Sequence, residues 1–577
     1  MRYLFRKIWG NPFAYLDPTK KTNWIGLLLT IGVVGLVLGL ISLSKEWTGV
    51  LRPTVVIDLS PWMLPRYAFF SLMRGLTAYA FSLLFTLLYG YWAAKDALAE
   101  RVLVPMLDIL QSIPVLGFMP GLILTLVSLF PHSNTGLELA AILMIFTGQA
   151  WNMTFSFYPS LRSVPADLRE AAALYRFDWW RSFKWVELPF SMMGLVWNSM
   201  MSMAGGWFFL MISEAFVLGD RDFRLPGIGS YMSVAVSNGN VSAMLWAIVA
   251  MMAMIVLLDQ FLWRPVVVWA QKFRIEDVGH SEKMTSWFLD WLGELRIRKA
   301  FAILRRWRKR KAHVAVPAVK PDPKPAPDWG RTLGHLVFIL LLMSMAAGVW
   351  KLILILKPVS LSEWGGILRS GAFTLARVLA ATTLGTLWTV PAGLAIGLSP
   401  RLSRALQPVV QVVASFPAPM LFPLVIAGLK VVGVPLGWGS ILLMLLGTQW
   451  YILFNVIAGA MFIPSDLKEA SEIYRIDGWQ RFRNLYLPAI FPYLVTGWVT
   501  AAGGAWNASI VSEYVFFKGE KLVAQGIGAE ISKAAETANL SLLAASIVVM
   551  STIVVLFNRT VWKRCYEAAE QRFSLSK

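Results

Sequence analysis

The chain alternates long apolar stretches with short polar and charged segments. Twelve stretches approach or exceed the roughly 20 residues that a helix needs to cross the hydrocarbon layer of a membrane, and they form two groups of six. The first group occupies residues 24–43, 68–94, 102–130, 137–158, 190–218 and 241–263, and the second 333–356, 370–398, 405–433, 438–462, 489–517 and 540–562. The pattern predicts an all-α integral membrane protein with about 12 transmembrane helices.

Composition supports this class. The chain is 57% hydrophobic and 15% charged, with a mean hydropathy of +0.60, far too apolar for a soluble protein of this length. Its net charge of +20 comes from Lys and Arg between apolar stretches, as the positive-inside rule expects. We therefore attribute the charge to membrane topology and lipid headgroups, and we expect no nucleic-acid partner.

The charge distribution also predicts the organisation of the chain. Basic residues near the start place the N-terminus in the cytoplasm, and six crossings return the chain to that side, so the halves are expected to be parallel repeats with both termini cytoplasmic. The predicted halves are residues 1–265 and 332–577. The segment between them, 266–331, combines a basic run at 296–313 with a Pro-rich run at 316–327. We interpret it as a possible interfacial helix followed by an extended spacer that tethers the halves.

One polar segment occurs twice. Residues 165–189 and 464–488 share 12 of 25 positions without a gap, within predicted cytoplasmic loops at 162–189 and 461–488. Early acidic residues favour a helix N-terminus, and a proline begins the next crossing. The loops mix charged with large apolar side chains, which suits docking into a groove of another protein. The residues expected to contribute are Asp167, Glu170, Ala171, Tyr175, Arg176, Asp178, Trp180, Phe183 and Pro189, and Asp466, Glu469, Ala470, Tyr474, Arg475, Asp477, Trp479, Phe482 and Pro488.

The similarity of the halves extends beyond these loops. Glu214 matches Glu513, and Gly227-Ile228-Gly229 matches Gly526-Ile527-Gly528, all 299 positions apart. Upstream, the separation is 303, as between Arg74 and Arg377. The first half therefore holds four extra residues, which we place in the connection between its third and fourth helices.

A transport path needs polar groups inside the membrane. Arg74 and Arg377 lie in apolar stretches and could compensate an anion, although they could equally pair with carboxylates such as Glu214 and Glu513. Polar residues that could line a path, or bond between packed helices, are Gln149, Asn152, Asn198, Gln449, Asn455 and Asn507. The four histidines and the single cysteine, Cys565, show no ligand spacing, so we predict no metal site. No catalytic motif suggests an enzyme.

The repeated loops resemble the EAA loop of permease subunits from ATP-binding-cassette (ABC) importers. The family's Glu-Ala-Ala, Phe at plus thirteen and Leu-Pro at plus eighteen and nineteen are matched by Glu170-Ala171-Ala172, Phe183 and Leu188-Pro189. The second copy has Glu469-Ala470-Ser471, Phe482 and Leu487-Pro488. Both copies depart from the family at plus six, where Arg176 and Arg475 replace its usual glycine. The wider pattern resembles the branch that imports nitrate, sulfonates, taurine and bicarbonate-type anions.

This resemblance implies a type I importer permease with both halves in one bacterial inner-membrane chain. The loops would be coupling helices that dock two ABC ATPase subunits, and an extracytoplasmic solute-binding protein would deliver the substrate. The chain has no Gly-x-x-x-x-Gly-Lys-[Ser/Thr] motif, so ATP and Mg are expected on separate subunits and no cofactor on this chain. The alternative is a 12-helix secondary transporter of the major facilitator type, whose signature after the second helix is not matched at 90–102 or 397–406.

Overall fold

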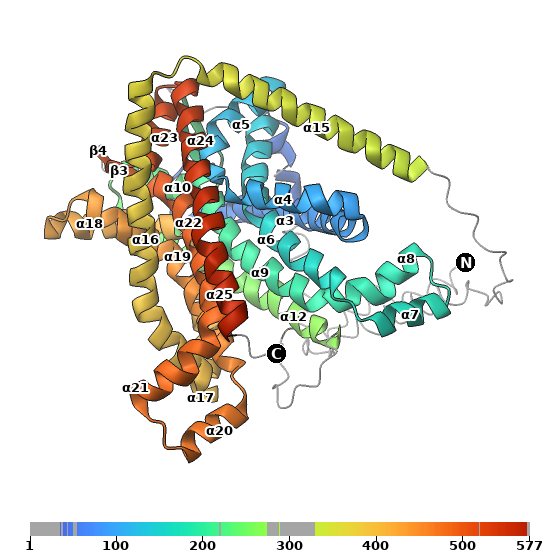
Figure 1. Ribbon diagram of the computed structural model, residues 1–577. Helices are drawn as coiled ribbons and strands as arrows, with labels where there is room; N and C mark the ends of the chain where they lie inside the picture. Colours follow the sequence, from blue (N-terminus) through green and yellow to red (C-terminus); the bar gives the residue numbers. More distant parts are fainter. Residues whose placement is uncertain are drawn as a thin grey trace, which may run out of the picture.

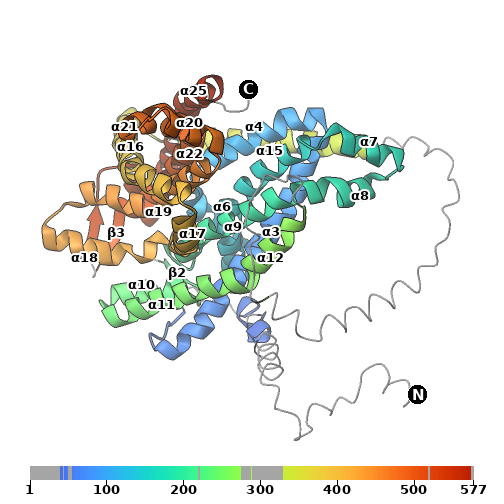
Figure 2. The same ribbon diagram turned by 90° about the horizontal axis from the view of Figure 1, so that it is seen from below.

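The computed structural model describes residues 55–218, 221–273, 329–517 and 520–573, together with Phe288 and scattered positions between 35 and 49. Most of the predicted first crossing and most of the predicted linker lie outside this part of the chain. The described residues are predominantly helical, and their strands form two short antiparallel hairpins (Figures 1 and 2).

The two halves contain similar successions of elements. The first half comprises η2 (Pro61–Met63), α3 (Leu64–Lys95), α4 (Ala97–Ser112), α5 (Val115–Leu129), α6 (Thr135–Arg162), α7 (Ala166–Leu174), α8 (Trp179–Ser182), η3 (Phe183–Glu187), α9 (Leu188–Ser213), β1 (Ala215–Leu218), β2 (Arg221–Arg224), α10 (Ile228–Ser237), α11 (Val241–Leu258), η4 (Asp259–Trp263), α12 (Arg264–Ala270) and η5 (Gln271–Phe273). The second comprises α15 (Trp329–Leu356), α16 (Leu361–Leu398), α17 (Pro400–Ala414), η6 (Ala418–Met420), α18 (Phe422–Val432), α19 (Leu436–Met461), α20 (Ser465–Ile473), α21 (Gly478–Arg481), η7 (Phe482–Tyr486), α22 (Leu487–Ser512), β3 (Tyr514–Phe517), β4 (Glu520–Val523), α23 (Ile527–Glu536), α24 (Leu540–Phe557), η8 (Asn558–Trp562) and α25 (Lys563–Phe573).

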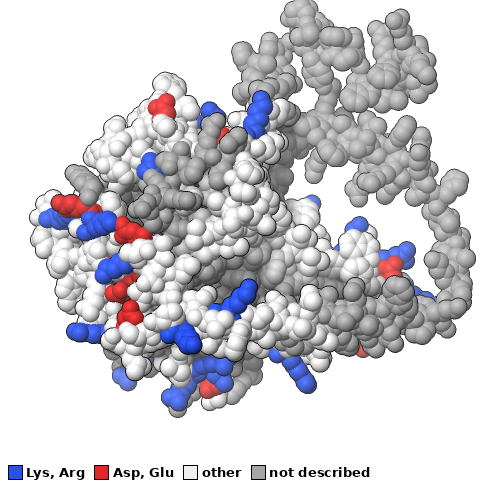
Figure 3. Space-filling model, turned by 90° about the horizontal axis from the view of Figure 1, so that it is seen from above, with Lys and Arg blue, Asp and Glu red and all other residues white. Residues whose placement is uncertain are grey.

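The all-α membrane class is confirmed. Seven helical spans among the described residues are long and apolar enough to cross a membrane: Pro61–Lys95, Trp179–Ser213, Val241–Phe273, Leu361–Leu398, Leu436–Met461, Gly478–Ser512 and Leu540–Ala569. Large side chains such as Leu387 and Leu88 are 68% and 65% exposed on these helices, as expected where the surroundings are lipid. Seen from above, broad uncharged areas separate small groups of charged side chains (Figure 3). The chain is a multi-pass membrane protein.

The prediction of one continuous helix for each third crossing is wrong. The stretch 102–130 is divided between α4 and α5 at Pro114, and 405–433 is divided among α17, η6 and α18 near Pro417. Proline donates no backbone hydrogen bond and disfavours helical geometry in the residue before it, so each helix stops there. The ends predicted for the fifth crossings are also corrected, because α9 and α22 stop at Ser213 and Ser512 and the following residues form β1 and β3.

The broken segments join the halves. In the first half, α4 and α5 contact α24 of the second half, and α5 also contacts α22. Reciprocally, η6 contacts α9 and α17 contacts α11. The largest hydrophobic cluster accordingly contains residues of both halves, including Trp207 and Trp506. Each half thus completes the packing of the other.

The four extra residues lie where the sequence comparison placed them. Residues 130–136 lead from the end of α5 to Leu137, whereas residues 433–435 lead from the end of α18 to the matching Leu436. The prediction of an insertion between the third and fourth helices is confirmed. Because Leu137 matches Leu436, the next residues, Glu138 and Gly437, occupy equivalent positions in the two halves.

Close helix packing within each half depends on small residues. The helices α3, α6 and α9 pack together, as do α16, α19 and α22. At the α6–α9 contact, a Cβ atom on Gly148 would lie 2.3 Å from the Phe209 ring. Glycine is therefore required there for the two helix backbones to approach.

Replacing Gly148 by alanine is expected to destabilise the protein by about 1–3 kcal/mol, because the rigid Phe209 ring must move. The matched control is Gly428→Ala in α18, where no atom lies within 4 Å of the added Cβ; this change is expected to be neutral or stabilising by up to about 1 kcal/mol. Thermal unfolding of the purified protein in detergent measures both. Equal unfolding midpoints for Gly148→Ala and the unaltered chain would contradict the packing assigned to this contact.

Candidate functional site

The repeated loops form two similar helical projections. α7 begins after Pro165 and α20 after Pro464, with Asp167 and Asp466 in their first turns. A tight turn then leads into α8 or α21. Figure 1 shows the loop of α7 and α8 at the right of the molecule and that of α20 and α21 at the bottom, on separate arms.

Arg176 and Arg475 make the turns after α7 and α20. Their φ angles are 50° and 51°, in the left-handed region. The amides of Arg176 and Phe177 donate to the carbonyls of Ala173 and Ala172, both at 2.9 Å, which is the hydrogen-bonding pattern of a helix end that usually has glycine in the left-handed position. The equivalent bonds in the second copy measure 3.0 and 2.9 Å. Both arginines therefore keep the backbone geometry of the glycine they replace, at a cost of roughly 1–2 kcal/mol each.

The side chains expected to dock divide into exposed and half-buried groups. The exposed ones are Asp167, Glu170, Tyr175, Arg176, Asp178 and Trp180 in the first loop, and Asp466, Glu469, Tyr474, Arg475, Asp477 and Trp479 in the second. Their neighbours Leu174 and Ile473, which the sequence analysis did not select, are 84% and 79% exposed. Ala171, Phe183 and Pro189 and their counterparts Ala470, Phe482 and Pro488 are half-buried. These residues attach the loops to the rest of the protein; for example, Phe183 packs edge-on against Tyr91 with ring centroids 5.2 Å apart.

Each loop continues without a break into a long helix. α8, η3 and α9 form one helical span from Trp179 to Ser213, and α21, η7 and α22 form another from Gly478 to Ser512. The joining segments η3 and η7 are π-helical, with the Leu188 amide donating to the Phe183 carbonyl and the Leu487 amide to that of Phe482. Pro189 and Pro488, the next residues, donate no hydrogen bond, which favours this local rearrangement. A displacement of either loop would therefore be passed directly to α9 or α22.

The first loop is also tied to neighbouring helices. Arg162 Nη1 donates to Glu100 Oε2 at 2.6 Å, and Tyr158 Oη donates to Glu100 Oε1 at 2.5 Å. The hydrogen bond from Tyr158, with Arg162 nearby, lowers the pKa of the Glu100 carboxyl. Lys95 Nζ donates to Glu187 Oε1 at 2.5 Å. These contacts hold α4 and the end of α3 against the base of the loop.

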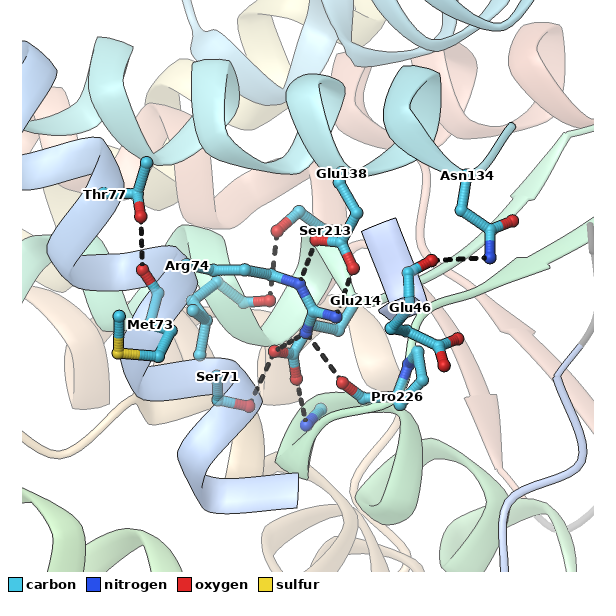
Figure 4. A network of polar contacts seen from close by, with 12 residues as sticks. Glu46, Ser71, Met73, Arg74, Thr77, Asn134, Glu138, Ser213, Glu214 and Pro226 are labelled. Atoms are coloured by element: carbon cyan, nitrogen blue, oxygen red, sulfur yellow. Dashed lines mark hydrogen bonds and ion pairs between the residues drawn. The ribbon is translucent and has the colours of Figure 1, made fainter. Parts of the chain in front are cut away.

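Arg74 lies in a closed network of buried charges. Its Nε and Nη2 donate to the two oxygens of Glu138 at 2.5 and 2.7 Å, and its Nη1 donates to Glu214 Oε1 at 2.7 Å and to the Pro226 carbonyl at 2.8 Å (Figure 4). The side chains of Arg74, Glu138 and Glu214 are at most 1% exposed. The pairing with Glu214 considered in the sequence analysis is confirmed.

The repeated glycines form a cradle for the buried carboxylates. Glu214 accepts hydrogen bonds from the Gly229 amide at 2.7 Å and from Ser71 Oγ at 2.6 Å. A Cβ atom on Gly227 would lie 2.2 Å from this carboxylate. In the second half, Glu513 accepts hydrogen bonds from the Gly528 amide at 2.9 Å and from Thr374 Oγ1 at 2.8 Å. A Cβ atom on Gly526 would lie 2.2 Å from the Glu513 carboxylate, so glycine is needed here as well.

We call the contacts of Arg74 with Glu138, Glu214 and Pro226 the first clamp, and those of Arg377 with Gly437, Glu513 and Gln525 the second. The two clamps differ most in the group that accepts from the arginine Nε atom. Arg377 Nη1 donates to Glu513 Oε1 and to the Gln525 carbonyl, both at 2.7 Å. Its Nε donates to the Gly437 carbonyl at 3.0 Å, so a backbone oxygen serves where Arg74 has the carboxylate of Glu138. Arg377 is 11% exposed and Arg74 is fully buried. Glu138 is not among the residues predicted from the sequence, because it aligns with a glycine in the other half; its only sequence signal is an acidic residue inside an apolar stretch.

Most of the other polar residues predicted for a path hold helices together. Gln149 accepts from Ser82 Oγ at 3.3 Å, Asn152 donates to Ser202 Oγ at 3.0 Å, and Asn198 donates to Ser156 Oγ at 2.8 Å. Gln449 accepts from Trp388 Nε1 at 3.0 Å, and Asn455 donates to the Tyr451 carbonyl of its own helix at 2.8 Å.

Asn507 differs from these residues because it connects the halves. Its Oδ1 accepts from the Val115 amide at 2.8 Å, which lies at the start of α5 just after the proline break. Nearby on the same interface, a Cβ atom on Gly205 of α9 would lie 3.4 Å from the Tyr451 hydroxyl of α19. Polar and small residues therefore meet between the halves at this level.

Comparison with known proteins identifies relatives of both halves. The sequence profile of the binding-protein-dependent transport system inner membrane component family matches residues 86–262 and 385–573, which together make up more than half of the chain. The chain is 24% identical over 188 residues to the nitrate import permease protein NrtB of Synechocystis sp. (strain ATCC 27184 / PCC 6803 / Kazusa), covering 33% of this chain and 65% of the relative.

Two other relatives have different names. The bicarbonate transport system permease protein CmpB of the same Synechocystis strain is 28% identical over 143 residues, covering 25% of this chain and 49% of the relative. The taurine transport system permease protein TauC of Escherichia coli (strain K12) is 25% identical over 186 residues, covering 32% of this chain and 64% of the relative. The chain thus spans about half to two thirds of the length of these relatives.

The clamps predict unequal effects of removing their arginines. Arg74→Met would leave two buried carboxylates without their cation, whereas Arg377→Met would leave one. Breaking a buried pair costs about 3–5 kcal/mol, so we expect Arg74→Met to lower the thermal unfolding midpoint more than Arg377→Met. Adding Glu138→Gln to Arg74→Met should recover part of the loss. Equal losses for the two single variants, or no recovery in the double variant, would contradict this account.

Proposed function

Because this chain belongs to the family of binding-protein-dependent transport system inner membrane components, we propose that it is the permease of an ATP-driven importer and supplies both permease halves itself. The observation that carries this proposal is the pair of exposed loops, each continuous with a long helix of its own half. A rival interpretation as a major facilitator gains no support, since the family profile matches both halves.

Each loop is proposed to dock one ABC ATPase subunit in the cytoplasm. The exposed acids Glu170 and Glu469 would make polar contacts at the rim, and Tyr175 and Tyr474 would enter apolar pockets. ATP and Mg are held by the ATPases, whose closure supplies the driving force. An extracytoplasmic solute-binding protein is the third partner, and the bacterial inner membrane with cytoplasmic termini is the proposed setting.

The chain's own part is to convert loop movement into opening of a path between its halves. The loops lie on separate arms (Figure 1), and the uninterrupted helical spans would carry their approach to α9 and α22. The buried clamps keep each half rigid, so that movement is concentrated at the interface between them. We place the path at this interface, where Asn507 is the favoured contact among the predicted residues. Arg74 is disfavoured as a substrate contact because its donors are engaged by Glu138, Glu214 and Pro226.

The proposed substrate is a small anion. The relatives are named as permeases for nitrate, bicarbonate and taurine, and all three solutes present an oxygen-rich anionic group. Amide and hydroxyl donors at the interface would bind such a group without the cost of a buried fixed charge.

The docking role predicts the effect of reversing two charges. The double variant Glu170→Lys and Glu469→Lys should lose most of its bound ATPase when the complex is purified from native membranes, because both rims then carry the wrong charge. Lys351→Gln, an exposed change on α15, should retain it. Normal recovery of ATPase with the double variant would remove the loops from the docking surface.

The transport role predicts ATP-dependent uptake. Proteoliposomes that contain the complete complex, with its binding protein outside, should accumulate nitrate, bicarbonate or taurine only when ATP is enclosed in the lumen. The double variant Glu170→Lys and Glu469→Lys should lower the rate of uptake at least tenfold. Uptake that persists without ATP and stops when the proton gradient collapses would instead support a secondary transporter.

A further inference from the structure

Arg176 and Arg475 keep a backbone conformation that glycine adopts more easily. Both side chains stand at the same place in the turn, with φ angles within one degree of each other. Glycine would relieve this strain without changing the turn. The same unfavourable choice in two halves that have diverged at 13 of the 25 loop positions indicates that the arginine side chain has a use that offsets the strain.

The described part of this chain shows no group that binds the side chain of either arginine. Three other arginines in the loops have partners: Arg162 pairs with Glu100, Arg169 donates to the Val164 carbonyl at 2.6 Å, and Arg481 donates to the Ile476 carbonyl at 2.8 Å. Arg483 is exposed without such a partner among the described residues, but it lies in a helical segment and carries no backbone strain. Within the described residues, the side chains of Arg176 and Arg475 make no hydrogen bond or ion pair and are exposed. Each therefore presents an unengaged guanidinium at the tip of its loop.

The immediate neighbours of these arginines make the position suitable for a strong ion pair. Leu174 and Tyr175 are 84% and 77% exposed, and Ile473 and Tyr474 are 79% and 78% exposed. If a partner covers these apolar side chains, water is removed from around the adjacent guanidinium. A charge pair at such a site contributes more than one at a wet rim.

We propose that Arg176 and Arg475 each bind a carboxylate in the docking groove of an ATPase subunit and thereby select the ATPases that this permease accepts. This inference rests on the proposed function and specifies the partner's chemistry: an acidic side chain bordered by an apolar pocket. A guanidinium suits this pairing because its planar donors can engage both carboxylate oxygens.

The test compares three double variants of the full-length chain in complex with its native ATPase subunits. Arg176→Gly with Arg475→Gly removes the charge and relieves the strain; Arg176→Lys with Arg475→Lys keeps the charge; Arg162→Gln with Arg481→Gln removes two charges that have internal partners. ATPase affinity is measured in detergent and in anionic nanodiscs, and unfolding of the isolated permease is followed by heating.

The glycine variant is expected to bind ATPase at least about tenfold more weakly, while its unfolding midpoint stays the same or rises. The lysine variant should lie between it and the unaltered chain, and the Arg162 and Arg481 variant should bind normally. Combining the charge reversals Arg176→Glu and Arg475→Glu with Lys in place of the partner acid should restore binding.

Three results would overturn the inference. Normal ATPase affinity of the glycine variant would show that the side chains are dispensable, while leaving the proposed function intact. A lower unfolding midpoint with weaker binding would assign the arginines a structural role. Weaker binding in anionic nanodiscs but not in detergent would make lipid headgroups their partner. Absence of any ATPase from the unaltered complex would instead defeat the proposed function.

Discussion

The architecture of each half depends on satisfying a guanidinium inside the membrane domain, fully buried in the first half and 11% exposed in the second. Such a group has little or no access to water, so its donors are met by carboxylates and backbone carbonyls brought from distant parts of the chain. The clamps at Arg74 and Arg377 join the first core helix of each half to the carboxylate at the end of α9 or α22 and to the carbonyl that precedes the Gly-Ile-Gly cradle. The hairpins β1–β2 and β3–β4 occupy the chain between these two points. The clamp therefore fixes where each long helix ends.

With each half held in this way, the interface between halves is left as the place where shape can change. The broken segments α4–α5 and α17–η6 pack on the opposite half. The break at Pro114 leaves the Val115 amide free to donate to Asn507 Oδ1. The same helices α9 and α22 carry the clamp carboxylates at one end and the projecting loops at the other. Movement of a loop would thus act on one end of α9 or α22 while the clamp holds the other end.

The two halves are similar but not interchangeable. A carboxylate completes the first clamp where a glycine carbonyl completes the second, and Arg377 is correspondingly less buried. The loops, in contrast, retain the same turn and the same exposed arginine. The turn that carries this arginine thus has the same geometry in both halves, as expected if both loops meet similar partner surfaces.

Sequence alone determined the membrane class, the duplication, the helical loops and the position of the four-residue insertion, because hydrophobic periodicity and repeated spacing are local properties. It placed the loop residues in one segment but could not separate exposed Tyr175 from half-buried Phe183, since exposure depends on Tyr91 from α3. Only the tertiary structure showed that Glu138 meets Arg74 and that the third crossings break to reach the other half. Both outcomes arise from contacts between residues far apart in the chain, where the need to satisfy buried charges and to fill the interface decides the geometry.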